Sequence, residues 1–425
     1  MVYAVSGLTL CGVIACILKN RQVGRTHKFS LYWVVALAGA LLLLAVGPLS
    51  PGEVGAALTA DRGLNPLKIL LLFLSLSGLS VFLDEAGFFG WLSARAVRRS
   101  GGSQKKLFFG IYALVSVLTV FTSNDIIILT FTPFLCYFAA RAEVDPRPYL
   151  FAEFAGANTF SMLLIFGNPT NVYIASAFSA DFVHYFLVMA LPTLCAGSAV
   201  TLVLYLLFRK ELSRPISCAA VGEVQMDRGL SAVGCAVLGG CILLMALSSY
   251  IGLEMEWISL GGCLLVFAAA LFRGKAGLDR IWGTLKRLPW ALVPFLLGMF
   301  VVVTELDAVG LTAAVGSLLA NLPEVFGYGL ASFFCCSLIN NIPMSVLFTQ
   351  ILTAAGAGEG GMFAVVIGSN LGALFTPVGA LAGIMWMRMA SGTGVRIGFG
   401  KFTAVGALVS LPALLAALGA LALVL

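Results

Sequence analysis

The stretch FTSNDIIILTFTP, residues 121–133, sets four polar residues into a strongly apolar region: Thr122, Ser123, Asn124 and Asp125. Hydrophobic residues make up 60% of the 425-residue chain, and charged residues only 10%. A soluble globular domain needs more charge than this to cover its solvated surface. Because a carboxylate inside a membrane is costly, one found there marks a functional position. The stretch therefore predicts a polar site within a membrane protein.

Repeated apolar runs of about 20 residues predict an all-α polytopic membrane protein. Transmembrane barrels show alternating segments of about ten residues, and the sequence contains none. The formal net charge of +6 does not predict a nucleic-acid partner, because Lys and Arg in a membrane protein mark its cytoplasmic face. The ten cysteines include no CxxC pair, so we expect packing roles for Cys335 and Cys336 and no fixed metal site.

The basic residues orient the chain in the membrane. A basic loop at 19–28 follows the first apolar run, which places the N-terminus outside. With this orientation only Arg62 and Lys68 lie outside, and the other 23 of the 25 basic residues face the cytoplasm. We therefore expect a multi-pass protein of a bacterial-type inner (cell) membrane, with membrane lipid around it and both termini outside.

Two segments are too short to cross the membrane twice. Residues 107–140 lie between two basic loops, and each arm has about 15 residues, so a re-entrant hairpin entering from the cytoplasm fits better than two spans. Residues 325–355 form a second short-armed pair that meets at Asn340 and Asn341. Acidic flanks predict that this second hairpin enters from outside.

Each hairpin is followed by a helix with a disrupted centre. The first covers residues 149–178 and contains Gly167 and Pro169; the second covers 361–390 and contains Pro377. Broken helices are tolerated in a membrane only where they are buried or line a wet cavity. Their N-termini attract anions or hydroxyl oxygens, and their C-termini offer carbonyls to cations.

The two halves of the chain have the same order of elements, which predicts two inverted-topology repeats. Each repeat has about five transmembrane helices and one re-entrant hairpin, with broken helices at the centre. The first repeat is expected at 1–208, a cytoplasmic linker at 209–228 and the second repeat at 229–425. The segments LDEAGFFGWLSA (83–94) and ELDAVGLTAAVGS (305–317) echo each other before the two hairpins.

The polar clusters predict one central site between the repeats. The residues expected to bind substrate are Ser123, Asn124, Asn158, Asn168, Thr170, Asn171, Asn340, Asn341, Asn370 and Thr376. Asp125 is expected to couple transport to an ion, either a proton or sodium. Sodium would lie near Asn124, Asp125, Asn168, Asn340 and Asn370.

Contacts within the site are also predicted. The tip of the first hairpin should contact the first broken helix. The tip of the second hairpin should contact Asn370, Thr376 and Pro377. The alternative is that Asn and Ser merely cap the broken helices. Glu153 stands early in its helix, which predicts a place near the cytoplasmic surface.

Four motifs carry a resemblance to the membrane subunit of arsenite efflux systems, the ArsB type. This family lies within the ion transporter superfamily, beside the NhaD-type sodium/proton antiporters and the divalent-anion/sodium symporters. The motifs are LDEAGFFGW (83–91), SNDIIILTFTP (123–133), SLINNIP (337–343) and IGSNLGALFTPVGALAGIMW (367–386). The chain departs from the family pattern at Asn158 and Asn370, where that family tends to have aspartates.

The resemblance implies a secondary active transporter. The leading interpretation is an ion-coupled antiporter that exports arsenite, antimonite or a related small inorganic solute by an elevator-like movement. The alternative is a sodium-coupled transporter of a small anion, such as a dicarboxylate or oxyanion, or a sodium/proton antiporter. An enzyme is not expected, because His27 and His184 sit in loops away from any nucleophile at depth. No cofactor is expected; a homodimer and, for an arsenite pump, a cytoplasmic ATPase subunit are the protein partners considered.

Overall fold

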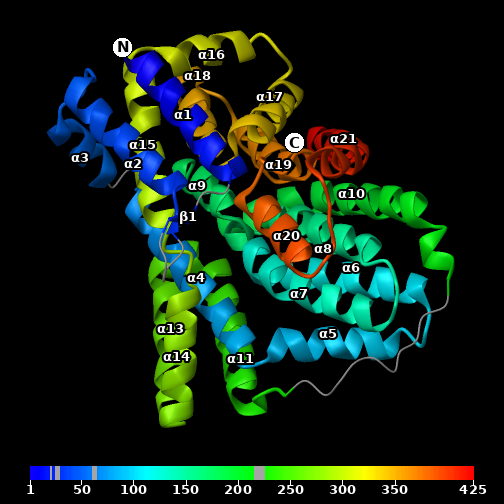
Figure 1. Ribbon diagram of the computed structural model, residues 1–425. Helices are drawn as coiled ribbons and strands as arrows, with labels where there is room; N and C mark the ends of the chain where they lie inside the picture. Colours follow the sequence, from blue (N-terminus) through cyan, green and yellow to red (C-terminus); the bar gives the residue numbers. More distant parts are fainter. Residues whose placement is uncertain (20–21, 24–28, 60–64, 215–224) are drawn as a thin grey trace.

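The computed structural model describes residues 1–19, 22–23, 29–59, 65–214 and 225–425 (Figure 1). Apart from β1 (Gln22–Val23) and β2 (Phe29–Ser30), which pair antiparallel, its regular elements are helices. Six helical segments of the described chain are long and apolar enough to cross a membrane. The predicted all-α class is confirmed.

The described residues of the first half of the chain form ten α-helices. They are α1 (Val2–Lys19), α2 (Tyr32–Val46), α3 (Pro51–Thr59), α4 (Pro66–Glu85), α5 (Phe88–Arg99), α6 (Gln104–Phe121), α7 (Asn124–Arg141), α8 (Arg147–Phe160), α9 (Pro169–Ala177) and α10 (Phe182–Phe208). Two 3₁₀ turns, η1 (Ser161–Leu163) and η2 (Ile165–Gly167), separate α8 from α9, and η3 (Glu211–Ser213) follows α10.

The second half contains eleven α-helices in its described residues. They are α11 (Arg228–Ala246), α12 (Ser248–Ile251), α13 (Met255–Leu271), α14 (Lys275–Arg287), α15 (Leu292–Ala308), α16 (Leu311–Leu319), α17 (Glu324–Ile339), α18 (Asn341–Ala355), α19 (Glu359–Phe375), α20 (Leu381–Gly392) and α21 (Phe399–Val424). Residues 215–224 of the expected linker lie outside the described residues.

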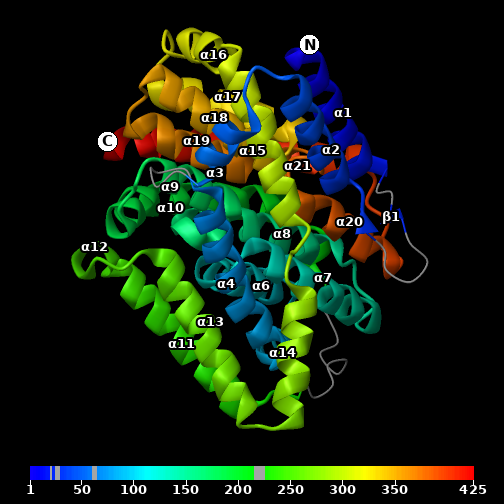
Figure 2. The same ribbon diagram turned by 90° about the vertical axis from the view of Figure 1, so that its left-hand side faces the viewer.

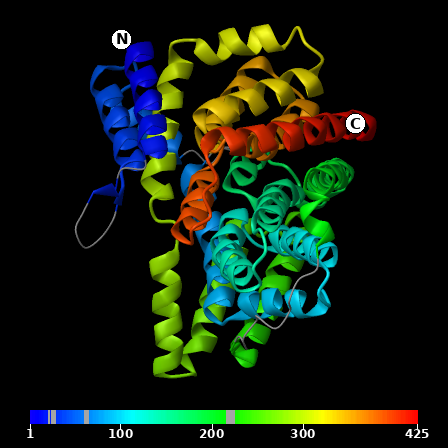
Figure 3. The same cartoon turned by 45° about the vertical axis from the view of Figure 1, so that its right-hand side comes forward.

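The helices form two groups that lie side by side (Figures 1 and 3). The scaffold group consists of α1, α2, α4, α11, α13, α14 and α15, and Figure 2 shows most of it from the front. The hairpin group consists of α6 to α10 and α17 to α21, in which α17 packs on α19 and α10 packs on α21.

Both predicted hairpins have matching helix pairs. In the first, α6 ends at Phe121, Thr122 and Ser123 are extended, and α7 begins at Asn124. In the second, α17 and α18 meet at Asn340. Its φ of 81° is positive, which is a backbone conformation that residues other than glycine rarely adopt. The Asn340 side chain offsets part of that strain, because its Oδ1 accepts the Ile342 N–H at 3.3 Å and caps α18.

Both predicted broken helices are interrupted where Pro and Gly stand. After α8 the chain becomes extended at Leu164 and Asn168, and α9 restarts with Pro169 in its first turn. Proline suits that position because its missing N–H would have no helical partner. After α19 the chain is extended at Thr376, and α20 restarts at Leu381.

The two segments that echo each other in sequence make the same turn. Gly87 follows α4 and Gly310 follows α15, and each has a φ of 82°. Their N–H groups donate to the carbonyls of Asp84 and Asp307, both at 2.8 Å. The short helices that follow, α5 and α16, lie at opposite ends of the molecule (Figure 1). This match fits the expected repeats, whose boundaries and inverted orientation stay a prediction.

Candidate transport site

A cavity of about 460 Å³ lies between the scaffold group and the hairpin group. Scaffold residues Tyr32 and Trp33 of α2 line it, together with the segment that joins α14 to α15. The hairpin group contributes three residues predicted for the site, which are Asp125, Asn168 and Asn341. The cavity therefore contacts both groups and residues of both halves of the chain.

Four helix N-termini meet at this cavity. Asp125 lies in the first turn of α7, Asn168 caps α9, Asn341 begins α18, and Ala380 precedes α20; all four line the cavity. The first N–H groups of a helix have no partner within it, and they carry the positive end of the helix dipole. Such an arrangement binds anions or the oxygens of a neutral solute.

The charged residues of the cavity lining are one acid and three bases. The acid is Asp125, and the bases are Lys286, Arg287 and Arg388. The Arg287 guanidinium donates to Asp84 Oδ2 at 2.5 Å and to Glu85 Oε1 at 2.8 Å, so its charge is balanced. Lys286 lies 5.8 Å from the ring centre of Trp282, and no acid of the described chain forms an ion pair with Arg388.

Asn370 of α19 is the centre of a buried polar network between the two broken helices. Its Oδ1 accepts the Ser161 hydroxyl at 2.8 Å and the Asn168 amide at 3.1 Å. Its Nδ2 donates to Asn171 Oδ1 at 2.6 Å. Beside it, the Ser369 hydroxyl donates to Thr170 Oγ1 at 2.9 Å. The network joins the two halves of the chain inside the hairpin group.

The prediction that Asn370 meets the second tip is wrong. Asn340 instead donates its Nδ2 to the carbonyl of Val378 at 2.9 Å, and Thr376 donates to the carbonyl of Ser337 at 2.6 Å. Both residues therefore hold the second hairpin against the second break through backbone carbonyls. The physical reason is that Asn370 lies on the side of α19 that faces the first broken helix.

The tip of the first hairpin presents buried oxygen atoms. Asn124 Nδ2 donates to Asn158 Oδ1 at 3.2 Å. Asn124 Oδ1, Ser123 Oγ and Thr159 Oγ1 are buried and have no hydrogen-bond partner among the described residues. Amide and hydroxyl oxygens of this kind suit a hard cation such as sodium. The described residues contain no group of three or more metal-ligating acids, cysteines or histidines.

The sequence interpretation missed three polar residues of the hairpin group. Ser161 and Ser369 belong to the Asn370 network, and Ser369 is its immediate neighbour in sequence. The third is Glu153, whose side chain is 0% exposed inside the hairpin group; its predicted place near the cytoplasmic side stays a prediction. Glu153 is the single acid in residues 147–178, which could have indicated a special role. Its early position in α8 instead favoured a place near the end of the helix.

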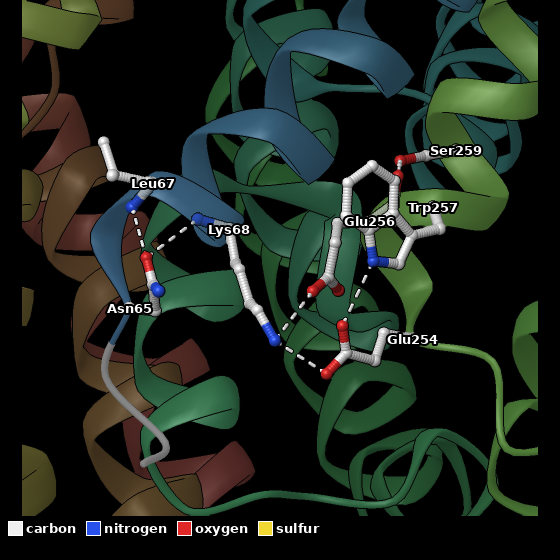
Figure 4. Close-up of polar contacts among 7 residues, drawn as sticks. All are labelled: Asn65, Leu67, Lys68, Glu254, Glu256, Trp257 and Ser259. Carbon is white, nitrogen blue, oxygen red and sulfur yellow. Dashed lines mark hydrogen bonds and ion pairs between the residues drawn. The ribbon is translucent and has the colours of Figure 1, made fainter. Parts of the chain in front are cut away.

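A second cavity, of about 430 Å³, lies where α4 approaches α12 and α13. In Figure 4, Lys68 of α4 reaches Glu254 and Glu256, with Nζ to carboxylate oxygen distances of 2.7 and 3.7 Å. The hydrogen bond from Lys68 holds the pKa of Glu254 below its ordinary value. Lys68 is paired with both glutamates, and these ion pairs link α4 to α13. The two acids therefore account for a lysine on the side of the membrane that is predicted to be outside.

Comparisons with known proteins agree with this architecture. The family model for citrate transporters (CitMHS) matches residues 26–363. An arsenical pump membrane protein of Escherichia coli K12 is 30% identical and covers 98% of this chain and 99% of its own length. A putative arsenical pump membrane protein of Bacillus subtilis is 23% identical over 87% of this chain and 89% of its own length.

Two solved transporters share the fold. The YdaH transporter of Alcanivorax borkumensis gives a TM-score of 0.56 at 17% identity, covering 99% of this chain and 97% of that one. MtrF of Neisseria gonorrhoeae gives 0.52 at 14% identity, covering 98% and 94%. The relatives are membrane pumps and transporters, which supports the prediction that the chain is not an enzyme. The chain belongs to the CitMHS family and is a multi-pass membrane transporter similar to the arsenical pump membrane proteins.

Proposed function

We propose that the protein is an ion-coupled antiporter that exports arsenite, antimonite or a related small inorganic solute. The cavity at which four helix N-termini meet beside Asn168 and Asn341 is the observation that supports this most strongly. Arsenious acid is neutral at pH 7, so amides, hydroxyls and helix N-termini can bind its oxygens without a charged partner. The names of the 30%-identical relatives point to the same class of solute.

The proposed mechanism is an elevator-like alternating access. The hairpin group would carry the site across the membrane against the scaffold group, and the cavity would open alternately to each side. The cavity supports this because the two groups line it from opposite sides. The Asn370 network would keep the two broken helices together as the hairpin group moves.

Asp125 is the proposed site of ion coupling. It lines the cavity beside the first tip, so a cation bound there would feel the charge and position of the solute. The ion is either a proton taken up by the carboxylate or sodium held with the free oxygens of Ser123 and Asn124.

A sodium-coupled transporter of a small anion is the second candidate. Lys286 and Arg388 add positive charge to a cavity that already collects helix N-termini. A dicarboxylate or oxyanion would find electrostatic partners there, and the family description names citrate. A sodium/proton antiporter is the remaining alternative, in which Asp125 would carry the transported ion.

Purified protein in liposomes separates these functions. Uptake of arsenite or labelled citrate is measured under an imposed pH gradient and, separately, an imposed sodium gradient. Arsenite accumulation that Asn341→Ala abolishes, with Ser248→Ala of the second cavity as a control, would support the first proposal. Sodium-driven citrate uptake without arsenite uptake would select the second. If neither solute accumulates, both proposals fail.

A further inference from the structure

Glu153 is a buried acid that the proposed site does not use. It lies in α8, at 0% exposure, between α7 and α20. Thr132 of α7 places its hydroxyl oxygen 3.0 Å from Oε1 and 3.3 Å from Oε2. Trp386 of α20 donates its indole N–H to Oε2 at 3.0 Å. The carboxyl group thus contacts helices of both halves of the chain.

The surroundings of Glu153 contain no compensating cation among the described residues. Helix α7 carries the Cys136 thiol and Arg141, whose guanidinium lies 4.7 Å from the ring centre of Tyr137. Arg147 of α8 is paired with Asp145, Lys401 of α21 also acts on Asp145, and Arg388 of α20 lines the cavity. Aromatic rings of Phe154 and Phe402 pack against Trp386. An ionised carboxylate in such a place would lack the partner that burial of charge requires.

The hydrogen bonds suit a protonated carboxyl group. Trp386 can only donate, and Oε2 accepts its N–H in either protonation state. Thr132 can donate to a carboxylate or accept from a carboxylic acid, because its hydroxyl rotates. Both hydrogen bonds can therefore exist in the protonated and in the ionised state of Glu153, as a proton-binding site requires.

Access to this proton depends on α20. Trp386 covers the carboxyl group, whereas Ile384, Met385 and Arg388 of the same helix line the transport cavity. Since Glu153 has no exposed surface, a proton can exchange with water only after a neighbouring side chain moves, and Trp386 is its hydrogen-bonded neighbour on the helix that lines the cavity. We propose that Glu153 is a second proton-binding site, loaded and unloaded as α20 moves during transport. This inference rests on the proposed function and extends it.

Infrared spectroscopy tests proton binding without any substrate. The full chain in liposomes is titrated with acid and base, and the C=O band of protonated carboxyl groups is recorded. Wild-type protein should show a band at neutral pH that Glu153→Gln lacks. Glu305→Gln, at a second glutamate that is 0% exposed in the described part of the chain, should retain it. If the band persists in Glu153→Gln, or is lost only in Glu305→Gln, the proposal is overturned.

Transport in liposomes tests the coupling to α20. The glutamine amide keeps an oxygen for Trp386 and a donor for Thr132 but cannot titrate. We expect Glu153→Gln to retain exchange of arsenite across the membrane at equal pH and to lose accumulation driven by a pH gradient. Normal gradient-driven accumulation in this variant would refute the proposal. If the wild-type protein moves no arsenite, the proposed substrate fails instead, and the infrared result still decides Glu153.

Discussion

Substitution of Asn370 by alanine should disconnect the two broken helices. Asn370 makes side-chain contacts with Ser161, Asn168 and Asn171, all buried in the hairpin group. Ser161 would keep a partner, because its hydroxyl also donates to the carbonyl of Asn158 at 2.8 Å. The Asn168 amide and Asn171 Oδ1 would each lose the partner described above.

The expected cost follows from these two groups. A buried polar group left without a partner costs about 1–3 kcal/mol. Side-chain hydrogen bonds between membrane helices average only about 0.6 kcal/mol, because the unfolded chain in a membrane also finds partners. Two stranded groups should therefore cost about 1 to 6 kcal/mol. Water entering the space left by the amide would favour the lower end of that range.

Thermal unfolding of the purified protein measures this cost. Asn370→Ala should lower the apparent melting temperature clearly, and it should also reduce transport. Ser369→Ala is the matched control: it removes one hydrogen bond, to Thr170, whose hydroxyl still donates to Asn168 at 3.0 Å. Equal melting temperatures for the two variants would show that the Asn370 network does not hold the broken helices together.

Three further predictions address coupling, topology and pH. Asp125→Asn keeps the size of the side chain in the first turn of α7 and loses its charge, so substrate binding should survive while ion-driven accumulation is lost; normal accumulation would remove Asp125 from the mechanism. Cysteines at Lys105 and Gly358, both exposed, should react with a membrane-impermeant reagent only from the cytoplasm and only from outside, respectively, and reversed labelling would contradict the topology. Hydrogen bonds, first from the Ser249 hydroxyl, lower the pKa of Asp181. The stability this bond contributes is present above the ordinary aspartate pKa of about 3.9 and is lost as pH falls through the lower folded value, so melting temperature should vary less with acid pH in Asp181→Asn.

The positions of the hairpins and breaks could be predicted from sequence because local rules control them. Short arms between like-charged loops identified both hairpins; Pro169 begins the helix after the first break, and Pro377 lies within the second break. Asp125, Asn168 and Asn341 were expected at one polar site, since polar residues at such breaks must find partners or water, and they line one cavity; their roles in binding and coupling stay predictions.

Contacts between distant helices could not be predicted in the same way. The sequence does not tell which side of α19 faces the first broken helix, so Asn370 was assigned to the wrong partner. The burial of Glu153 depends on Trp386, 233 residues later in the chain. No periodicity within α8 records the presence of that indole ring.

The matched turns at Gly87 and Gly310 differ in what surrounds them. A side chain at Gly87 would come within 2.4 Å of the Gln225 carbonyl, and the Asp227 N–H donates to the neighbouring Ala86 carbonyl at 2.9 Å. A side chain at Gly310 would meet nothing within 4 Å. Residues 225–227 thus contact the turn before the first hairpin, whereas at the second turn the matching carbonyl, that of Val309, accepts the Tyr3 hydroxyl of α1 at 3.0 Å. A movement of residues 225–227 would therefore act on the first hairpin and a movement of α1 on the second, so the two matched turns respond to different parts of the chain.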